Sequence, residues 1–286
     1  MLEALQFEFF RNALLAGILV SVICGVVGTF VVVNRIVFLA GGIAHAAFGG
    51  IGLAFFLGLP FLVGTLGFSL TAALAMATVT LKSRHRADTV IGVMWAVGMA
   101  LGVLLLDMTP GYNVDLMSYL FGSILTVPDV DVWLTAALGV LVMGVVGYFY
   151  NELLATSYDQ DFARVRGVPV TLFYYLMILL VALAVVMTIR VVGLILVIAL
   201  LTIPPYIAEK FTSSLRRMMV LASLLSCLFT VVGLWSSYRF NLTSGATIIM
   251  VAAAGFFMSQ VVVRARKAGM PAPAESQRHG AGGQNR

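Results

Sequence analysis

The sequence predicts an all-α protein, a polytopic transmembrane bundle of about eight or nine helices, and two observations carry this prediction. Of the 286 residues, 61% are apolar and only 10% are charged, whereas a soluble domain has about 25% charged residues. The apolar residues also form long continuous runs, such as Leu172 to Ile189. A helix needs about 20 such residues to cross the hydrocarbon core of a membrane. A strand of a membrane β-barrel typically shows about ten residues in which apolar and polar side chains alternate, and these runs lack that alternation.

Nine apolar segments follow one another along the chain, and each is a candidate span. Two of them could be broken or re-entrant helices, 43–58 because it is short and 191–209 because it directly follows its neighbour. The expected spans are roughly 10–33, 43–58, 60–82, 88–106, 131–155, 170–189, 191–209, 214–236 and 243–264.

The positive charges lie in short clusters between these segments, which indicates membrane topology and not a nucleic-acid-binding surface. If the N-terminus is outside, 14 of the 17 Lys and Arg residues fall on the cytoplasmic side. Only Arg11, Arg190 and Arg239 fall outside. The bias predicts a multi-pass protein of the cytoplasmic (inner) membrane with the N-terminus outside and the C-terminus in the cytoplasm.

The chain is expected to form one transmembrane domain, residues 1–267, followed by a disordered cytoplasmic tail at 268–286. The tail is rich in Gly, Pro, Ala and Gln and has no apolar periodicity. Cys24 and Cys227 lie within apolar runs. We therefore interpret them as small core residues and not as a disulfide or a metal-binding pair.

The polar stretch 157–169 predicts a short amphipathic helix on the cytoplasmic side. Ser157 is the expected N-cap, and Gly167 supplies the left-handed stop. The apolar face and the charges that suit the helix dipole are carried by Tyr158, Asp161, Phe162, Val165 and Arg166. Such a helix either docks a soluble partner or lies on the membrane surface.

His45 lies among small and apolar residues in the segment 41–50. An ionisable residue in a span is costly and marks a functional site by default, and imidazole is a good ligand for zinc and similar metals. The alternative is a histidine that hydrogen-bonds between helices. Gly41 and Gly42 precede it and permit a backbone bend or a close approach.

Pro204 and Pro205 remove two backbone donors and predict a helix break at this point. The carbonyl groups that they free could line a cavity or pathway. Glu209 lies beside Lys210, so we interpret it as half of an interfacial ion pair.

The sequence offers no case for an enzyme and implies no cofactor. No Lys follows a Gly, so the chain has no phosphate-binding loop of the Walker A type. It also has neither a Ser/His/Asp grouping nor an HExxH sequence. If transport is driven by ATP, the ATPase is a separate polypeptide.

Several stretches, spread in order from residue 9 to residue 204, resemble the zinc/manganese/iron-type (ABC-3) permease family of bacterial and archaeal ABC importers. They are 9–16 with 24–30, 43–50, 88–92, 115–125, and 162–167 followed by 192–196 and 203–204. The resemblance implies a homodimeric permease that moves a divalent transition metal (zinc, manganese or iron). It also implies two protein partners, a cytoplasmic ABC ATPase and an extracytoplasmic metal-binding protein.

The resemblance further implies that residues 158–167 form the coupling helix, inserted into a groove of the ATPase, and that His45 lines the metal pathway. Many members of the family have an Asp four residues before this histidine, whereas this sequence has Gly41. The usual pair of ligands is therefore incomplete.

Two alternatives to a metal permease are a siderophore- or cobalamin-type ABC permease, which usually has ten spans, and an ion-coupled secondary transporter. A secondary transporter would need carboxylates within its spans, and these segments have almost none.

Overall fold

The computed structural model describes residues 8–83, 86–109, 122 and 124–268, and all regular elements in this part of the chain are helical. The long helices are α1 (Glu8–Val33), α2 (Val37–Leu57), α3 (Phe61–Lys82), α4 (Ala87–Asp107), α6 (Asp129–Tyr148), α9 (Val170–Val192), α10 (Leu194–Phe211), α11 (Leu215–Phe240) and α12 (Ser244–Ala268). The short elements are the 3₁₀ turn η3 (Ile124–Thr126) and the helices α7 (Tyr150–Tyr158) and α8 (Gln160–Val165).

Nine helices in the described residues are long and apolar enough to cross a membrane, in agreement with the nine predicted segments. Both doubtful segments are continuous helices. The first is α2, which begins six residues earlier than predicted at Val37, and the second is α10. The segment predicted at 131–155 ends early, because α6 stops at Tyr148 and α7 begins at Tyr150.

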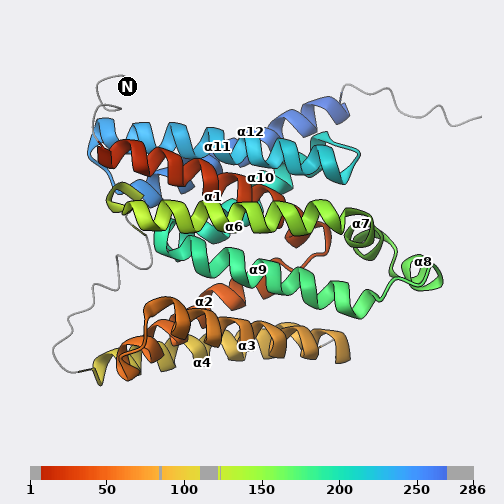
Figure 1. Cartoon of the computed structure of the whole chain (residues 1–286). Helices are drawn as coiled ribbons and strands as arrows, with labels where there is room; N and C mark the ends of the chain where they lie inside the picture. The colour runs from red at the N-terminus through yellow and green to blue at the C-terminus, as the bar shows by residue number, and fades with distance from the viewer. Residues whose placement is uncertain (1–7, 84–85, 110–121, 123, 269–286) are drawn as a thin grey trace, which may run out of the picture.

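The long helices run side by side in one bundle, with α3 and α4 at one edge and α11 and α12 at the other (Figure 1). Helix α1 packs against α6, α9, α10 and α11, and α2 packs against α3, α4 and α9. These two helices are therefore the most enclosed of the spans, whereas α4 and α12 expose most of their surface. The short helix α8 projects from one end of the bundle, at the end opposite to the start of α1 (Figure 1).

Small residues allow α2 and α4 to pack at backbone contact. A Cβ added at Gly98 would lie 2.8 Å from the Cα of Ala46, and one added at Gly102 would collide with the Phe48 carbonyl. A Cβ at Gly50 would instead meet α3, 2.9 Å from the Cα of Thr65. These three glycines therefore serve helix packing, as is common for small residues of helices in lipid.

Two contacts join buried polar side chains of different helices. Ser21 of α1 and Thr230 of α11 are both buried, and their hydroxyl oxygens lie 2.9 Å apart. Asp131, in the first turn of α6, pairs with Arg190 in the last turn of α9 at 3.1 Å. This carboxylate is only 7% exposed, and removing its partner would leave a buried charge uncompensated.

Pro204 and Pro205 do not break α10, and the prediction of a helix break here is wrong. The helix runs unbroken from Leu194 to Phe211 with both prolines inside it. The carbonyl of Leu201, which would normally accept from residue 205, lies against Gly28 of α1. A neighbouring helix thus covers the carbonyl that Pro205 leaves without its usual donor, and neighbouring helices are one means by which membrane helices tolerate proline.

Three smaller predictions concern side chains. Cys24 and Cys227 are both free thiols, as expected. Glu209 pairs with Lys210 at 3.8 Å, as predicted. The tail at 269–286, with its predicted disorder, lies outside the described residues.

Candidate functional site

His45 lies in the middle of α2. In the run Leu39–Ala54 of that helix, all residues except His45 and Leu53 are buried. Its Nδ1 lies 2.8 Å from the carbonyl oxygen of Gly41, one turn earlier. A carbonyl oxygen only accepts, so Nδ1 carries the proton and donates it. In the neutral ring, Nε2 then keeps its lone pair. Metal-binding histidines are typically oriented in this way, with the other ring nitrogen donating to a carbonyl or carboxylate.

The aromatic side chain of Trp95 on α4 holds the imidazole in place. The two rings are stacked, with their centroids 3.9 Å apart and an angle of 27° between their planes. Phe38, two turns before His45 on α2, also contacts Trp95 with ring centroids 5.9 Å apart. The stack covers one face of the imidazole and restricts its rotation, so Nε2 has a defined direction.

Gly41 and Gly42 have opposite surroundings. A Cβ added at Gly41 would meet no atom within 4 Å, whereas one added at Gly42 would lie 2.6 Å from Ile91 of α4. Neither glycine breaks α2, which is continuous through both, so the predicted helix break is absent. Gly42 serves close packing, and Gly41 leaves an open space on the helix face beside His45.

In the part of the chain that the structure describes, no three His, Cys, Asp or Glu side chains come together in a way that could hold a metal ion. Among these residues, His45 is therefore a single potential ligand. Such a residue suits an ion in passage, because transport requires release as well as binding.

The short helix predicted in the stretch 157–169 is present, but its boundaries differ from the prediction. Ser157 is not the N-cap, because α7 continues through it to Tyr158. The N-cap is Asp159, whose carboxylate accepts a hydrogen bond of 2.9 Å from the backbone N–H of Phe162. The helix α8 is then only six residues long, Gln160–Val165. Asp159 has the extended backbone that a cap requires, with φ −147°, whereas Ser157 is already helical.

The apolar side chains of this region point away from the bundle. Tyr158, Phe162 and Val165 are 61%, 52% and 88% exposed, whereas Ala163 is fully buried and anchors α8. Arg166 lies 5.1 Å from the centre of the Phe162 ring, and Asp161 pairs with Arg164 at 3.4 Å. Gly167 ends the helix with φ +81°, as predicted.

Tyr158 belongs to α7 and so contributes to the exposed surface from the preceding helix. Partial burial raises the pKa of its hydroxyl above the usual value, and Tyr150 and Glu209 raise it further. The hydroxyl is neutral at physiological pH, as tyrosine is already at its usual pKa.

One contact of this region was not anticipated from the sequence. Asn34, in the turn between α1 and α2, donates from Nδ2 to the hydroxyl of Ser157 at 3.0 Å and to the carbonyl of Phe30 at 2.9 Å. Ser157 thus links the end of α7 to the start of the helix that carries His45. No local pattern could have revealed a contact between residues so far apart in the chain.

A cavity of about 580 Å³ opens at the same end of the bundle, between α1, α10 and α12. Arg35, Tyr206, Glu209 and Lys210 line it. The ammonium of Lys210 lies 4.6 Å from the centre of the Tyr206 ring and also pairs with Glu209. The one carboxylate of this lining is thus already neutralised. Pro204 and Pro205 are buried and are not among the residues that line this cavity.

The described part of the chain is a bundle of nine apolar helices, with a short exposed helix at one end and a half-buried histidine in one of its most enclosed spans. This is the architecture of a multi-pass membrane permease. The chain belongs to the ABC 3 transport family, whose model matches residues 6–263. This confirms the predicted zinc/manganese/iron-type permease family, and the chain is a transporter subunit and not an enzyme.

Relatives match over nearly the whole chain. An uncharacterized membrane protein of Synechocystis is 50% identical over 91% of this chain and 92% of its own length. The manganese transport system membrane protein MntC of Listeria monocytogenes is 34% identical over 89% of this chain and 91% of its own. The solved structure of PsaBC from Streptococcus pneumoniae in complex with Fab has a chain with a TM-score of 0.82 and 34% identity. The match covers 90% of this chain and 93% of that one.

Proposed function

We propose that this permease imports a divalent transition metal, with manganese as the preferred cargo, and that His45 contacts the metal as it crosses. An ABC ATPase docks on α8, and an extracytoplasmic metal-binding protein delivers the ion at the opposite end. The choice of manganese is supported by the relatives at 34% identity, which include manganese transport proteins.

The observation that carries the role of His45 is its hydrogen bond to Gly41. A bare divalent ion is prohibitively unstable in a low-dielectric layer and must exchange water for protein ligands. With Nδ1–H donating to the Gly41 carbonyl, the lone pair of Nε2 is free to bind the metal. Since the position of the family's Asp is occupied by Gly41, water completes the coordination in our proposal, and the ion is held weakly.

The role of α8 in docking is supported by its exposed apolar side chains and its position beyond the ends of α6 and α9 (Figure 1). With α8 in the cytoplasm, nine spans place the N-terminus outside and the C-terminus inside. This orientation agrees with the distribution of the basic residues.

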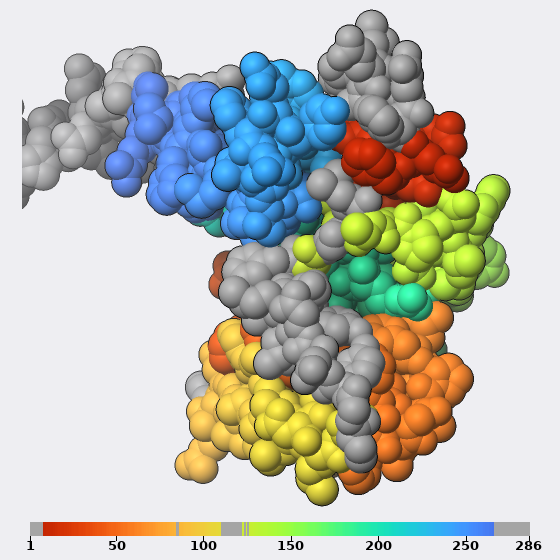
Figure 2. All heavy atoms as spheres, turned by 90° about the vertical axis from the view of Figure 1, so that its left-hand side faces the viewer, coloured from red at the N-terminus to blue at the C-terminus, as the bar shows by residue number. Residues whose placement is uncertain are grey.

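We also propose that the permease is a homodimer. The surface is recessed between α4 and α12 (Figure 2), the two spans with the least buried surface. A two-fold dimer that met along these helices would bury apolar faces that each chain leaves open.

The test is uptake of radiolabelled manganese and zinc by vesicles that contain the permease with its ATPase and binding protein. We expect ATP-dependent uptake that favours manganese, and we expect His45→Ala to lower it at least about tenfold, as for other changes at metal sites. His45→Phe separates binding from packing, because phenylalanine can stack on Trp95 but cannot bind a metal. Uptake at the wild-type rate in His45→Phe would show that the histidine only packs between helices.

A further inference from the structure

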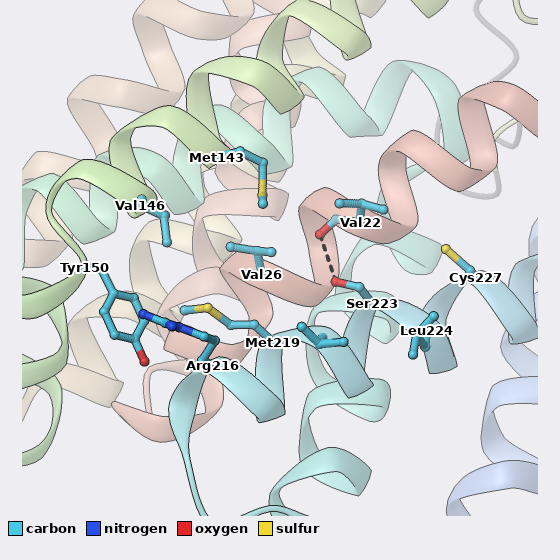
Figure 3. A pocket seen from close by; sticks show the side chains of 12 residues that line it. Val22, Val26, Met143, Val146, Tyr150, Arg216, Met219, Ser223, Leu224 and Cys227 are labelled. Atoms are coloured by element: carbon cyan, nitrogen blue, oxygen red, sulfur yellow. Dashed lines mark hydrogen bonds between the residues drawn. The ribbon is translucent and has the colours of Figure 1, made fainter.

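An apolar groove of about 430 Å³ runs along the flank of the bundle, between α1, α6, the start of α7 and α11. Val26 forms part of its floor, and the partly exposed side chains of Met143 and Leu224 form part of its rim (Figure 3). Helices α1 and α11 pack closely at the floor, because Gly25 faces the backbone of Ser223. The hydroxyl of Ser223 donates to the Val22 carbonyl at 3.4 Å.

The two ends of this groove differ in chemistry. Arg216 and Tyr150 lie together at one end, and Cys227 lies at the other (Figure 3). The guanidinium carbon of Arg216 is 5.0 Å from the centre of the Tyr150 ring. Among the described residues, no carboxylate forms an ion pair with Arg216, so its charge is not neutralised within this part of the chain.

The length of the groove corresponds to one leaflet of the bilayer. Arg216 and Cys227 are eleven residues apart on α11, which is about 16 Å at 1.5 Å per residue. Half of the hydrocarbon core is about 15 Å thick. With Arg216 at the membrane–water interface, where Arg and Tyr side chains are commonly found, Cys227 lies near the middle of the membrane.

These features favour a lipid over a protein helix as the occupant. A spanning helix from a partner would need an apolar groove about 30 Å long, roughly twice the length of this one. An acyl chain needs only one leaflet, and a phosphate is a good partner for an unpaired guanidinium, which can donate two parallel hydrogen bonds to it.

We propose that this groove binds one acyl chain of an anionic phospholipid from the leaflet on the side of α8, with Arg216 and the Tyr150 hydroxyl holding the phosphate. Tyr150 is the first residue of α7, and α7 leads directly to the N-cap of α8. The lipid headgroup therefore contacts the helix that positions the proposed docking element. The inference requires only that the bundle lies in a membrane, and it does not depend on the metal or on the role of His45.

The headgroup is tested by comparing two neighbouring arginines. The purified permease is placed in nanodiscs of equal parts phosphatidylglycerol and phosphatidylcholine, and the lipids that stay bound are identified by native mass spectrometry. We expect the wild type to retain phosphatidylglycerol preferentially. Arg216→Gln should reduce this preference about fivefold, the effect of one basic residue near an anionic lipid surface. Arg217→Gln is the matched control, because Arg217 does not line the groove, and it should leave the preference unchanged. If both variants lost the preference for phosphatidylglycerol equally, general surface charge would explain the result, and the proposal would be overturned.

The acyl chain is tested by filling the groove. Gly147 lines it, and a Cβ there would meet no atom within 4 Å, so Gly147→Phe occupies the groove without disturbing the helices. Gly144→Phe is the control, since a Cβ at this exposed glycine also meets no atom within 4 Å but Gly144 lies outside the lining. We expect bound phosphatidylglycerol to be lost in Gly147→Phe and kept in Gly144→Phe. If Gly147→Phe retained as much phosphatidylglycerol as the wild type, the lipid would be excluded as the occupant of the groove. The lipid would also be excluded if Gly147→Phe lost a bound second protein chain and not the lipid.

Discussion

The imidazole of His45 is fixed by two contacts of different kinds. The hydrogen bond to Gly41 determines which ring nitrogen carries the proton, and the stack on Trp95 determines the plane of the ring. Together they present one unprotonated nitrogen in a defined direction, with little rotational freedom to lose when a metal binds. The other feature of this site is the open space at Gly41, which has room for the side chain of a second metal ligand.

Restoring that ligand should strengthen metal binding. Residues 41 and 45 are one turn apart on the same helix face, and the side chain of Gly41→Asp would enter open space. A carboxylate adds charge and an oxygen ligand, which manganese prefers. We expect manganese affinity of the purified permease, measured by isothermal titration calorimetry, to rise about tenfold, equivalent to about 1.4 kcal/mol.

Gly42→Asp provides the control for this substitution. It adds the same charge one residue away, but its Cβ would press against Ile91. We expect a lower melting temperature and no gain in affinity. If both variants bound manganese equally tightly, a general effect of negative charge would explain the result, and the specific geometry of residues 41 and 45 would be excluded.

The helix α8 is a short element that depends on its surroundings. Six residues are far too few for a stable helix in isolation, and α8 is held by the Asp159 cap, the buried Ala163 and the Gly167 stop. The exposed pair Asp161–Arg164 adds little, because surface ion pairs typically contribute about 0–1 kcal/mol. Its apolar side chains are therefore free to contact a partner.

A charge placed on this surface should disrupt docking. In Phe162→Asp, a carboxylate would be forced into an apolar contact, and we expect the permease to lose its stimulation of the partner ATPase. Membrane insertion should be normal, because Phe162 lies outside the spans. Asp161→Asn, one residue away, should keep most of the stimulation. The measurement is ATP hydrolysis by the reconstituted complex, and full stimulation in Phe162→Asp would mean that α8 rests on the lipid surface instead.

The close contact between α2 and α4 predicts that alanine substitutions at two glycines, Gly102 and Gly67, have different effects on stability. Gly102→Ala would push a methyl group into the Phe48 backbone, and overpacking of this kind costs about 1–3 kcal/mol. In Gly67→Ala the added Cβ meets no atom within 4 Å, so stability should be unchanged or slightly higher, since alanine favours the helix. Thermal unfolding of the purified variants in one detergent would test this. A Gly102→Ala variant as stable as the wild type would refute tight packing at this point.

At the scale of the whole molecule, the nine spans of the described residues decide which helix ends lie on the same side of the membrane. The start of α1 lies at one end of the bundle, and α8 and the end of α12 lie at the other (Figure 1). Arg216 and Lys210 lie at the end with α8, whereas Arg190 lies at the opposite end, where it pairs with Asp131. The cation bias thus predicts that the α8 end faces the cytoplasm.

Labelling of single cysteines in intact cells would test this orientation. In a background without Cys24 and Cys227, Arg164→Cys should be protected from a membrane-impermeant reagent until the cells are opened. Arg11→Cys should be labelled from outside without opening them. Labelling of Arg164→Cys in intact cells would invert the topology and remove the docking role of α8.

The number of spans and their approximate positions could be predicted without any tertiary information. A helix in lipid must satisfy its own backbone and present apolar side chains wherever it packs, so each span carries its signal locally. The same holds for His45, which is conspicuous because ionisable residues are rare in spans. The Gly167 stop is equally local, since a left-handed backbone position favours glycine.

Other features depend on neighbours that are distant in the sequence. The continuity of α10 through Pro204 and Pro205 depends on Gly28 of α1, and the orientation of His45 depends on Trp95 of α4. The N-cap of α8 is Asp159 and not the predicted Ser157, because α7 continues through Ser157 to Tyr158. The local sequence pattern shows where a helix crosses the membrane, because the hydrocarbon core surrounds every span in the same way. The contacts between helices depend on which surfaces meet, and only the packed bundle decides that.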